Sequence, residues 1–328
     1  MNELVSIIVP VFNVAPWIKR CFLSLKNQTY PNIEVLFIND GSSDESAEII
    51  KNLIRDDHRF TLFNKENGGP GSARNFGLKN AKGEYCIFVD SDDDIRLDAV
   101  ENLLQVARDE RLDVLAANSF VTELSGRQRP GIKIVKPVEG VVTGMSFMAQ
   151  SIKRNQYSGS VCINVYRVPF LREFGLYFDE ATLIEDEEWM PRVFEKAERV
   201  KFIDFQFYHY HLRVSSQMSA DNLLENYKAV LYVCNKLDEH FKKGHVTKEV
   251  KILLNHLVEM CLEWTSDNLQ YLFIYKQNTF ASKMIWNAMR ISTFTKVLFF
   301  KVAPNLYARC KHKYRLISKK IRGENNEN

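Results

Sequence analysis

The sequence lacks the features that mark disulfide-stapled, fibrous or membrane-spanning proteins. Its six cysteines lie singly, at least 27 residues apart, so no zinc-ligand or redox spacing occurs and we expect a reducing compartment. Only 9 of 328 residues are proline and 14 are glycine, which excludes collagen-like and low-complexity chains. No uninterrupted apolar run reaches the roughly 18 residues that a spanning helix needs. No basic lead precedes the apolar run at residues 4–12, so we expect no secretory signal and a cytoplasmic location.

Acidic residues are missing from one long segment. Residues 268–322 contain twelve Lys or Arg, ten aromatic residues and no Asp or Glu, which leaves 32 basic against 41 acidic residues elsewhere. A basic, aromatic segment is typical of a surface that contacts anionic lipid, so we expect peripheral membrane contact through 268–322. The alternative is a helix that packs on the main domain with a solvated basic face. No nucleic-acid-binding motif accompanies the charge, so no nucleic acid partner is expected.

The first 120 residues alternate short β-branched runs with helical segments. The runs lie at residues 5–10, 33–39, 60–64, 85–90 and 112–117. Continuous apolar runs indicate strands that are covered on both faces, so we predict an α/β fold: a mostly parallel, Rossmann-like central sheet with helices on both faces. Ser42 and Glu45 have the spacing of a capping box and predict the start of the second helix.

The rest of the chain is read more coarsely. Glycines and prolines break the pattern at 121–160, a segment of a length that can reach over a cleft. From residue 222 apolar residues recur at three- and four-residue steps, which predicts amphipathic helices. We therefore predict two domains, a nucleotide-sugar-binding and catalytic domain at 1–220 and a helical region at 221–328 that ends in the basic tail.

Polar or acidic loops follow four successive predicted strands, at residues 10–13, 39–44, 65–71 and 90–94. Ligands of open parallel sheets bind at this edge. Asp90 and Asp92 form a DxD motif that suits Mn²⁺ or Mg²⁺ together with substrate phosphate, and the alternative is an acidic turn that caps a helix. Asp40 is either a turn aspartate or an acceptor for a base or ribose. No Walker-A motif occurs and no GxGxxG follows the first strand, which disfavours kinase-like and dinucleotide-binding functions.

Several linked motifs resemble glycosyltransferase family 2 on a GT-A fold. They are SIIVPVFN, INDGSSDES, NGGPGSARNFGL and FVDSDDD over residues 5–95, and more loosely IEDEEW and YHYHLRVSSQMS up to about residue 216. The resemblance implies inverting transfer of a hexosyl or N-acetylhexosaminyl group from a nucleoside diphosphate, UDP in the first instance, to a saccharide hydroxyl. It also implies an acceptor carried on a polyprenyl diphosphate, in surface polysaccharide synthesis at the inner face of the cell membrane, as in bacterial capsule, O-antigen and exopolysaccharide enzymes.

The resemblance also implies roles for single residues. Asp186 matches the catalytic base, with Glu185 beside it. Trp189 matches a residue that forms a wall of the acceptor site. The alternative for the acids of this stretch is that they stabilise a helix N-terminus. Asp92 matches the metal ligand, with His211 as a second ligand, although a histidine in an aromatic run is often simply packed. The donor-binding residues implied are Pro10, Val11, Phe12, Asn13, Asp40, Gly68, Gly69, Arg74, Asp90, Ser91 and Arg213.

Two other functions stay open at this point. A sugar-phosphate nucleotidyltransferase would need a basic, Gly-rich loop after the first strand, where this chain has PVFNVAPW. A non-catalytic nucleotide-sugar-binding subunit would not need the acids at 90, 92 and 186. Turnover or hydrolysis of a donor separates the last alternative from an enzyme.

Overall fold

The structure is a computed structural model that describes residues 3–123, 125–131, 139–213, 223–244 and 246–267. The chain divides into two compact units, Met1–Ser216 and Gln217–Asn328. Within the described ranges no helix is both long and apolar enough to cross a bilayer. The segment 268–322 lies outside the described residues, so its membrane contact and the functional division of the two domains stay predictions.

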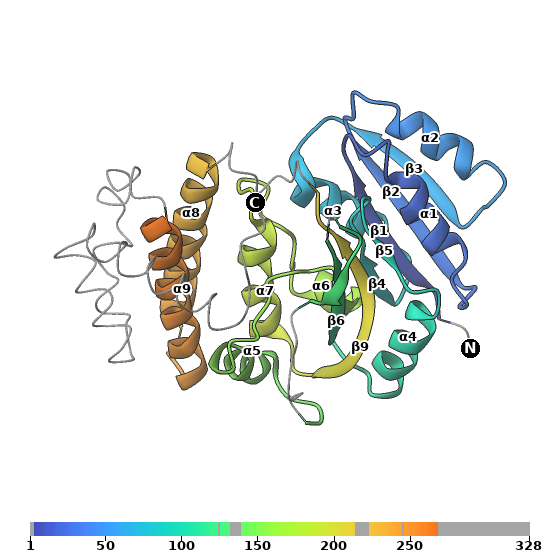
Figure 1. Cartoon of the computed structure of the whole chain (residues 1–328). Coiled ribbons are helices and arrows are strands. Elements are labelled where there is room, and N and C mark those ends of the chain that lie inside the picture. Colours follow the sequence, from blue (N-terminus) through green and yellow to red (C-terminus); the bar gives the residue numbers. More distant parts are fainter. Residues whose placement is uncertain (1–2, 124, 132–138, 214–222, 245, 268–328) are drawn as a thin grey trace. The chain divides into compact units, whose positions relative to one another are not determined.

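Nine strands of the described chain form one sheet in the first unit (Figure 1). Across the sheet the order is β3-β2-β1-β4-β8-β6-β9-β5, and β7 pairs with the end of β6. The strands are β1 (Val5–Val11), β2 (Ile33–Asp40), β3 (Phe60–Lys65), β4 (Tyr85–Phe88), β5 (Asp94–Ile95), β6 (Val114–Thr122), β7 (Gln128–Pro130), β8 (Asn164–Arg167) and β9 (Val200–His211).

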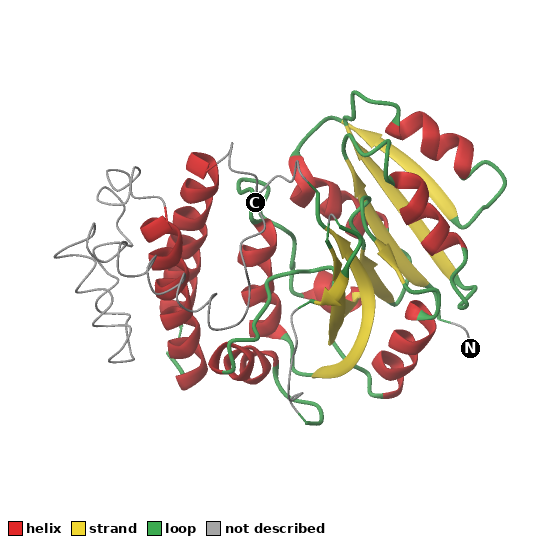
Figure 2. Ribbon diagram, viewed as in Figure 1, coloured by secondary structure: helices red, strands yellow, loops and turns green. Residues whose placement is uncertain are grey.

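The amino-terminal half of the sheet is parallel. β1 lies between β2 and β4 and is parallel to both, and β2 is parallel to β3. Ile7, Ile8 and Val9 of β1 are fully buried, as expected for a strand that is covered on both faces. Helices lie on both sides of the sheet (Figure 2), which confirms the predicted α/β class.

The other half of the sheet is mixed. β8 is antiparallel to β4 and β6, and β5 is antiparallel to β9. The parallel arrangement expected from the sequence is therefore found in β1–β4, whereas the rest of the sheet combines one further parallel pair, β6 and β9, with antiparallel neighbours. The segment before β8 contains Gly159, which lies against Glu187 near the start of α7, and β8 then runs antiparallel to β4.

β6 and β9 are parallel, but their register shifts twice. Ala116 is level with Phe202, whereas Ser119 is level with Tyr208. Three residue steps on β6 therefore match six on β9, and the irregularity lies between these positions. Beyond it the register is regular to Thr122 and His211. The end of β9 thus has a fixed position along the sheet.

The first unit contains seven helices among its described residues. They are α1 (Ile18–Lys26), α2 (Ser46–Leu53), α3 (Gly69–Asn80), α4 (Ala99–Asp109), α5 (Gly144–Lys153), α6 (Val168–Glu173) and α7 (Glu185–Lys196). In Figure 1, α1 and α2 cover one face of the parallel strands and α3 lies on the other. Gly77 lets α3 approach β1 closely, because a Cβ at this position would lie 2.3 Å from Ile8 Cγ2.

The predicted capping box at the start of α2 is wrong. The helix begins at Ser46, and the side chain of its N-cap residue, Glu45, makes no capping hydrogen bond. Asp44 instead accepts the backbone N–H of Ser46 at 3.0 Å, and Ser42 Oγ accepts the N–H of Asn13 at 3.2 Å. Ser42 is used to join the loops after β1 and β2, which local spacing cannot reveal.

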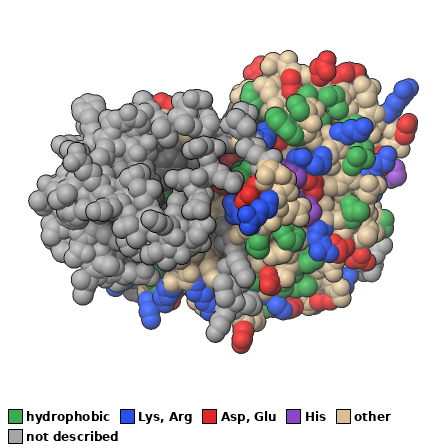
Figure 3. Space-filling model, viewed as in Figure 1, with side chains coloured by type: hydrophobic (Ala, Val, Ile, Leu, Met, Phe, Trp, Pro, Cys, Tyr) green, Lys and Arg blue, Asp and Glu red, His purple; other side chains and the backbone are tan. Residues whose placement is uncertain are grey.

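The second unit contains the two predicted amphipathic helices, α8 (Leu223–Lys242) and α9 (Lys248–Asp267). Val233, Leu237, Leu253 and Leu257 are buried in it. In the part of the chain described with side chains, four cysteines are free and buried: Cys21, Cys86, Cys162 and Cys234. Acidic, basic and hydrophobic side chains are interspersed over the coloured surface in Figure 3. The excess of basic over acidic residues in the sequence is concentrated in residues 268–322.

Candidate active site

The ends of the parallel strands are level with one another. Val11 is in register with Asn39, and Asp40 with Lys65. The backbone N–H of Val89, just past β4, still donates to Ile8 O at 3.0 Å, so the acidic loop that follows β4 starts at this edge too. The loops that were predicted to converge do meet at the carboxyl edge of β1–β4.

The loop after β1 exposes an aromatic ring. Phe12 is 45% exposed, whereas Val11 is fully buried and Pro10 is half-buried. Asn13 has a φ of 51°, in the left-handed region that asparagine tolerates better than most residues. Its Oδ1 accepts the N–H of Ser43 at 2.9 Å, which ties the loops after β1 and β2 together. This turn leaves the face of Phe12 open at the edge.

Asp40, the last residue of β2, is buried beneath the start of α3. Its carboxylate accepts the backbone N–H of Gly68 at 3.1 Å and that of Gly69 at 2.8 Å, and it pairs with Lys65 Nζ at 2.5 Å. Gly69 has a φ of 85°, which only glycine adopts readily. A carboxylate at a helix N-terminus stabilises the free N–H groups there. Asp40 therefore holds in place the loop that contains Gly68 and Gly69, the two glycines predicted to bind the donor.

Arg74 joins the acidic loop after β4 to the start of α7. Its guanidinium extends from α3 and binds Asp90 Oδ1 at 2.8 Å and Glu185 Oε1 on its other side. The Arg74 and Glu185 side chains are 7% and 5% exposed, whereas Asp90 is 35% exposed. The guanidinium also lies 5.7 Å from the ring centroid of Phe178. One buried cation thus holds two segments that are 95 residues apart in the sequence, at Asp90 and Glu185.

Four consecutive acids, Glu185 to Glu188, begin α7; Glu185 and Glu188 are buried, and Asp186 and Glu187 are half-buried. Burial raises the pKa of Glu185 to about 7, although Arg74 opposes this. Burial also raises the pKa of Asp186, again against Arg74. Glu187 lies against Gly159, where a Cβ would come within 2.3 Å of its Cδ, and burial raises its pKa to about 8, with a further contribution from Asp186. Raised carboxyl pKa values favour proton uptake near neutral pH.

Asp92 and Arg213 form an ion pair beside β5. The Asp92 side chain is 10% exposed and that of Arg213 25%. The Arg213 guanidinium lies 4.7 Å from the ring centroid of Trp17, and Arg20 donates to the backbone carbonyl of Asp92. Burial, followed by the charge of Asp90, raises the pKa of Asp92, and Arg213 opposes this shift. The DxD carboxylate therefore already carries a cationic partner. Ser91, between the two acids, is buried.

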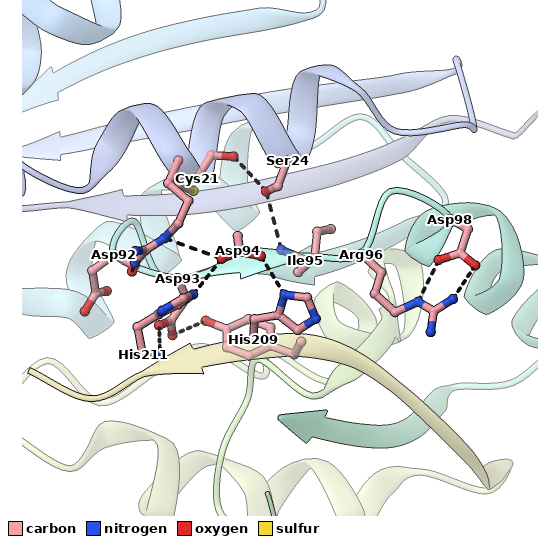
Figure 4. A network of polar contacts seen from close by, with 12 residues as sticks. Cys21, Ser24, Asp92, Asp93, Asp94, Ile95, Arg96, Asp98, His209 and His211 are labelled. Carbon is pink, nitrogen blue, oxygen red and sulfur yellow. Dashed lines mark hydrogen bonds and ion pairs between the residues drawn. The ribbon is translucent and has the colours of Figure 1, made fainter. Parts of the chain in front are cut away.

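The next two acids bind the end of β9. The Asp94 carboxylate lies between His209 Nδ1 and His211 Nε2, each at 2.7 Å, and both rings point toward it (Figure 4). Burial raises the pKa of Asp94, but hydrogen bonds from both histidines hold it below its ordinary value. Asp93 is fully buried and accepts Tyr208 OH at 2.7 Å and the backbone N–H of His211 at 2.8 Å. Burial raises the pKa of Asp93 well above its usual range.

The described residues contain no group of three or more His, Cys, Asp or Glu arranged to hold a metal ion. A hard divalent cation needs only one or two protein carboxylates when substrate phosphate and water complete its shell. Asp92 supplies one such carboxylate, which is 10% exposed and is paired with Arg213, so a cation at this position would take the place of the guanidinium. His211 is hydrogen-bonded to Asp94 instead, so its predicted role as a metal ligand stays a prediction.

The predicted acceptor wall at Trp189 is wrong for this structure. The indole is fully buried, stacks on Phe178 with ring centroids 4.3 Å apart, and contacts Phe88 and Tyr166 edge-on. Its Nε1–H donates to Leu176 O at 2.9 Å. A ring with no exposed surface cannot face an acceptor. Trp189 packs α7 against β4, and in this way it helps to position the acids at the start of α7.

Comparison with known proteins identifies the family. Residues 6–175 match the profile described as Glycosyl transferase family 2. The glycosyltransferase EpsH of Bacillus subtilis (strain 168) is 31% identical over 291 residues, which cover 82% of this chain and 80% of EpsH. The chain belongs to glycosyltransferase family 2.

Solved structures confirm the GT-A fold of this family 2 chain. S. aureus TarS (residues 1–349), crystallised with UDP-GlcNAc, aligns with a TM-score of 0.61 at 22% identity over 90% of this chain and 79% of TarS. The mannosyltransferase PcManGT of Pyrobaculum calidifontis, solved with GDP-Man and Mn²⁺, aligns with a TM-score of 0.58 at 15% identity over 97% and 81% of the two chains. At these identities the likeness concerns the fold.

The structure brings most of the predicted family 2 residues to one edge of the sheet, and the roles assigned to them stay predictions. Sequence reasoning missed four residues that hold this edge together: Trp17, Arg20, Asp94 and Tyr208. One signal was available, because His209 and His211 alternate on a strand and must point to the same face. No local pattern marks Trp17 or Arg20, which reach Arg213 and Asp92 only through the fold.

Proposed function

We propose that this family 2 glycosyltransferase transfers a hexosyl or N-acetylhexosaminyl group with inversion. In this proposal UDP is the leaving group, and a hydroxyl of a saccharide, carried on a lipid, is the acceptor. Asp186 takes the proton of the acceptor hydroxyl while that oxygen attacks the anomeric carbon from the face opposite the diphosphate. Direct displacement needs one base and a stabilised leaving group, without a covalent intermediate.

The observation that carries the proposal is the double contact of Arg74. Its guanidinium binds both Asp90, at the donor-side edge of the sheet, and Glu185, the residue before the proposed base. The half-exposed Asp186 begins the same helix as Glu185. A single rigid fork thus places a base candidate beside the strand ends where a nucleotide sugar would bind, and such positioning is worth many orders of magnitude in rate.

The environment of Asp186 suits a base that works near neutral pH. Burial raises its pKa, which increases its tendency to accept a proton, while Arg74 limits the rise and keeps the carboxylate available. Trp189 and Phe178 hold the helix from the core side. Glu185 would then act as a positioning residue through Arg74.

The donor side is proposed to be the loops after β1, β2 and β3. Phe12 would stack on the base, Asp40 would accept a hydrogen bond from it, and Gly68 and Gly69 would allow close approach of backbone. The exposed ring of Phe12 and the tie through Asn13 support this assignment. The neighbour TarS was crystallised with UDP-GlcNAc, which supports UDP as the nucleotide.

We place Mn²⁺ or Mg²⁺ at Asp92, and the neighbour solved with Mn²⁺ supports a metal in this fold. When bound, the cation would neutralise charge on the departing diphosphate as a Lewis acid. The residues of this chain do the rest. Asp92 would hold the cation, Arg213 and Asp90 would contact the donor, and His211 would hold Asp94 or join the metal.

The acceptor and location are proposed from the sequence. The basic, aromatic segment 268–322 would bring the enzyme to the inner face of the cell membrane, where polyprenyl-diphosphate-linked saccharides are available. Flotation of the full chain with vesicles that contain an anionic lipid, compared with neutral vesicles, tests the contact. Equal recovery in both vesicle fractions would contradict it.

The central test exchanges the base for its amide. Asp186→Asn is expected to lower transfer from UDP-sugars by at least about a hundredfold, because general bases contribute about 10²- to 10⁴-fold. Its thermal shift with UDP should be unchanged, since donor binding does not need the base. Glu195→Gln is a matched control on the same helix, where Glu195 pairs with Lys196 at 3.3 Å. Full transfer activity in the Asp186 variant would remove Asp186 from this role.

The alternatives are weaker. Family membership argues against a nucleotidyltransferase, and the loop after β1 ties itself to Ser43 through Asn13 and presents no basic cradle for a triphosphate. A non-catalytic binding subunit would show a thermal shift with UDP-sugars but neither transfer nor hydrolysis. A screen of nucleoside diphosphates and nucleotide sugars with and without Mn²⁺ therefore addresses donor choice and catalysis together.

A further inference from the structure

Arg213 occupies the carboxylate on which the proposed metal depends. Its guanidinium is ion-paired with Asp92, and it is stacked against Trp17 at 4.7 Å from the ring centroid. Asp92 is 10% exposed, so little of the carboxylate is left for water. The pair is thus held on two sides, by charge and by a cation–π contact, which is worth more when it is partly desolvated.

Arg20 lies at the same place but binds differently. It donates to the backbone carbonyl of Asp92, and its Nε lies 3.4 Å from Asp94 Oδ2. Arg20 therefore adds positive charge to this loop without taking the Asp92 carboxylate. The two arginines separate the effect of nearby charge from the effect of occupying the ligand itself.

We infer that Arg213 and the divalent cation compete for the Asp92 carboxylate. This inference rests on the proposed function, because it takes Asp92 as the metal ligand. In the donor-free protein Arg213 neutralises a carboxylate that would otherwise be buried without a partner. The cation displaces Arg213, and the released guanidinium is then free to bind a diphosphate, which it matches in geometry.

The competition predicts coupling between metal and nucleotide. A cation that binds alone must displace Arg213, and the guanidinium then has no new partner. The apparent affinity for the cation is therefore the intrinsic affinity multiplied by the small fraction of protein in which the Asp92 carboxylate is free. A cation that arrives with UDP offers the guanidinium a new partner. Metal should therefore bind weakly alone and more tightly with UDP, and UDP should gain from metal by the same factor.

Calorimetric titration of MnCl₂ into the full chain without nucleotide tests the competition. Arg213→Gln is expected to bind Mn²⁺ about tenfold more tightly than the wild type, within the range of typical site couplings. Arg20→Gln removes a neighbouring positive charge but leaves the ion pair, so it is expected to gain clearly less. Arg213→Lys keeps the charge without the planar fork and should fall between wild type and Arg213→Gln.

Trp17 gives a readout that does not depend on turnover. Displacement of the guanidinium from its ring is expected to change tryptophan emission when diamagnetic Mg²⁺ is added to the wild type with UDP. The change should disappear in Arg213→Gln and in Trp17→Phe. The other three tryptophans, Trp189, Trp264 and Trp286, are present in the wild type and in both variants, so their emission forms a constant background.

The outcomes separate this inference from the proposed function. Equal Mn²⁺ affinity for wild type, Arg213→Gln and Arg20→Gln would overturn the competition and leave a metal at Asp92 standing, provided that Asp92→Asn abolishes the binding. Equal gains in the two arginine variants would also overturn it, because charge alone would explain them. Absence of Mn²⁺ binding in every variant, with and without UDP, would overturn both the inference and the proposed metal site.

Discussion

Replacing Arg74 by methionine removes a buried cation that links the donor-side loop to the start of α7. Glu185 is 5% exposed and would stay buried without a partner, whereas Asp90 is 35% exposed and can recover water. Breaking a buried ion pair by removal of one partner typically costs about 3–5 kcal/mol. An exposed pair contributes only about 0–1 kcal/mol. We therefore expect a loss of about 3 kcal/mol in the free energy of unfolding, nearly all of it through Glu185.

The pH dependence identifies the cause. Burial raises the pKa of Glu185 to about 7 even beside Arg74, and without that guanidinium the pKa should rise further. Between the ordinary glutamate value of about 4.3 and the raised value, the folded variant holds a proton that the unfolded chain does not. Stability of the Arg74→Met variant should therefore fall as pH rises from 5 to 8, more steeply than that of the wild type.

Urea unfolding followed by circular dichroism at the two pH values measures this slope. The double variant with Glu185→Gln is the matched control, because the amide has nearly the same shape and no charge. It should recover at least half of the lost stability at pH 8 and lose the extra slope. The reasoning would be refuted if Arg74→Met matched the wild type at pH 8, or if the slope survived in the double variant.

Three further predictions concern other parts of the site. Asp40→Asn should weaken UDP binding about tenfold by calorimetry, a change of about 1.4 kcal/mol, and unaltered affinity would exclude a charge-dependent contact. Gly77→Ala places a Cβ 2.3 Å from Ile8 Cγ2 and should cost about 1–3 kcal/mol in urea unfolding; an unchanged midpoint would show that α3 can move away. The kcat/KM profile should fall on the acid side with a midpoint above the ordinary aspartate value of about 3.9, because burial raises the pKa of Asp186 and the protonated form is no base; a midpoint at or below that value would contradict this.

The parallel half of the fold was predictable because its signals are local. Runs such as residues 5–11 and 33–40 are apolar at most positions, and the helices between them have their own periodicity. The convergence of the loops then follows from the geometry of parallel strands. The mixed half was not predictable, because the neighbours and directions of β5, β6, β8 and β9 are pairings between segments far apart in the sequence, which no local pattern encodes.

The site was predictable by residue but not by contact. The motifs placed Asp90, Asp92 and Asp186 among the important acids, with Arg74 near Asp90, but they did not indicate the partners of Asp92 and of the acids that begin α7. That Arg74 binds both Asp90 and Glu185, and that Arg213 binds Asp92, depends on helices and strands far apart in the sequence. Trp189 was misjudged for a related reason: sequence shows an aromatic residue near a site but not which side of the helix it packs on.

The double register shift between β6 and β9 has a consequence for how this enzyme tolerates length changes. Past Ser119 and Tyr208 the two strands advance together, so the irregular stretch before them sets which β9 side chain reaches the acidic loop. Deleting one residue after that stretch would bring Tyr210 to the place of a histidine and turn both imidazoles toward the opposite side. Insertions and deletions should therefore be absorbed within residues 203–207, and chain grafts that preserve 208–213 as a block have the best prospect of retaining the site.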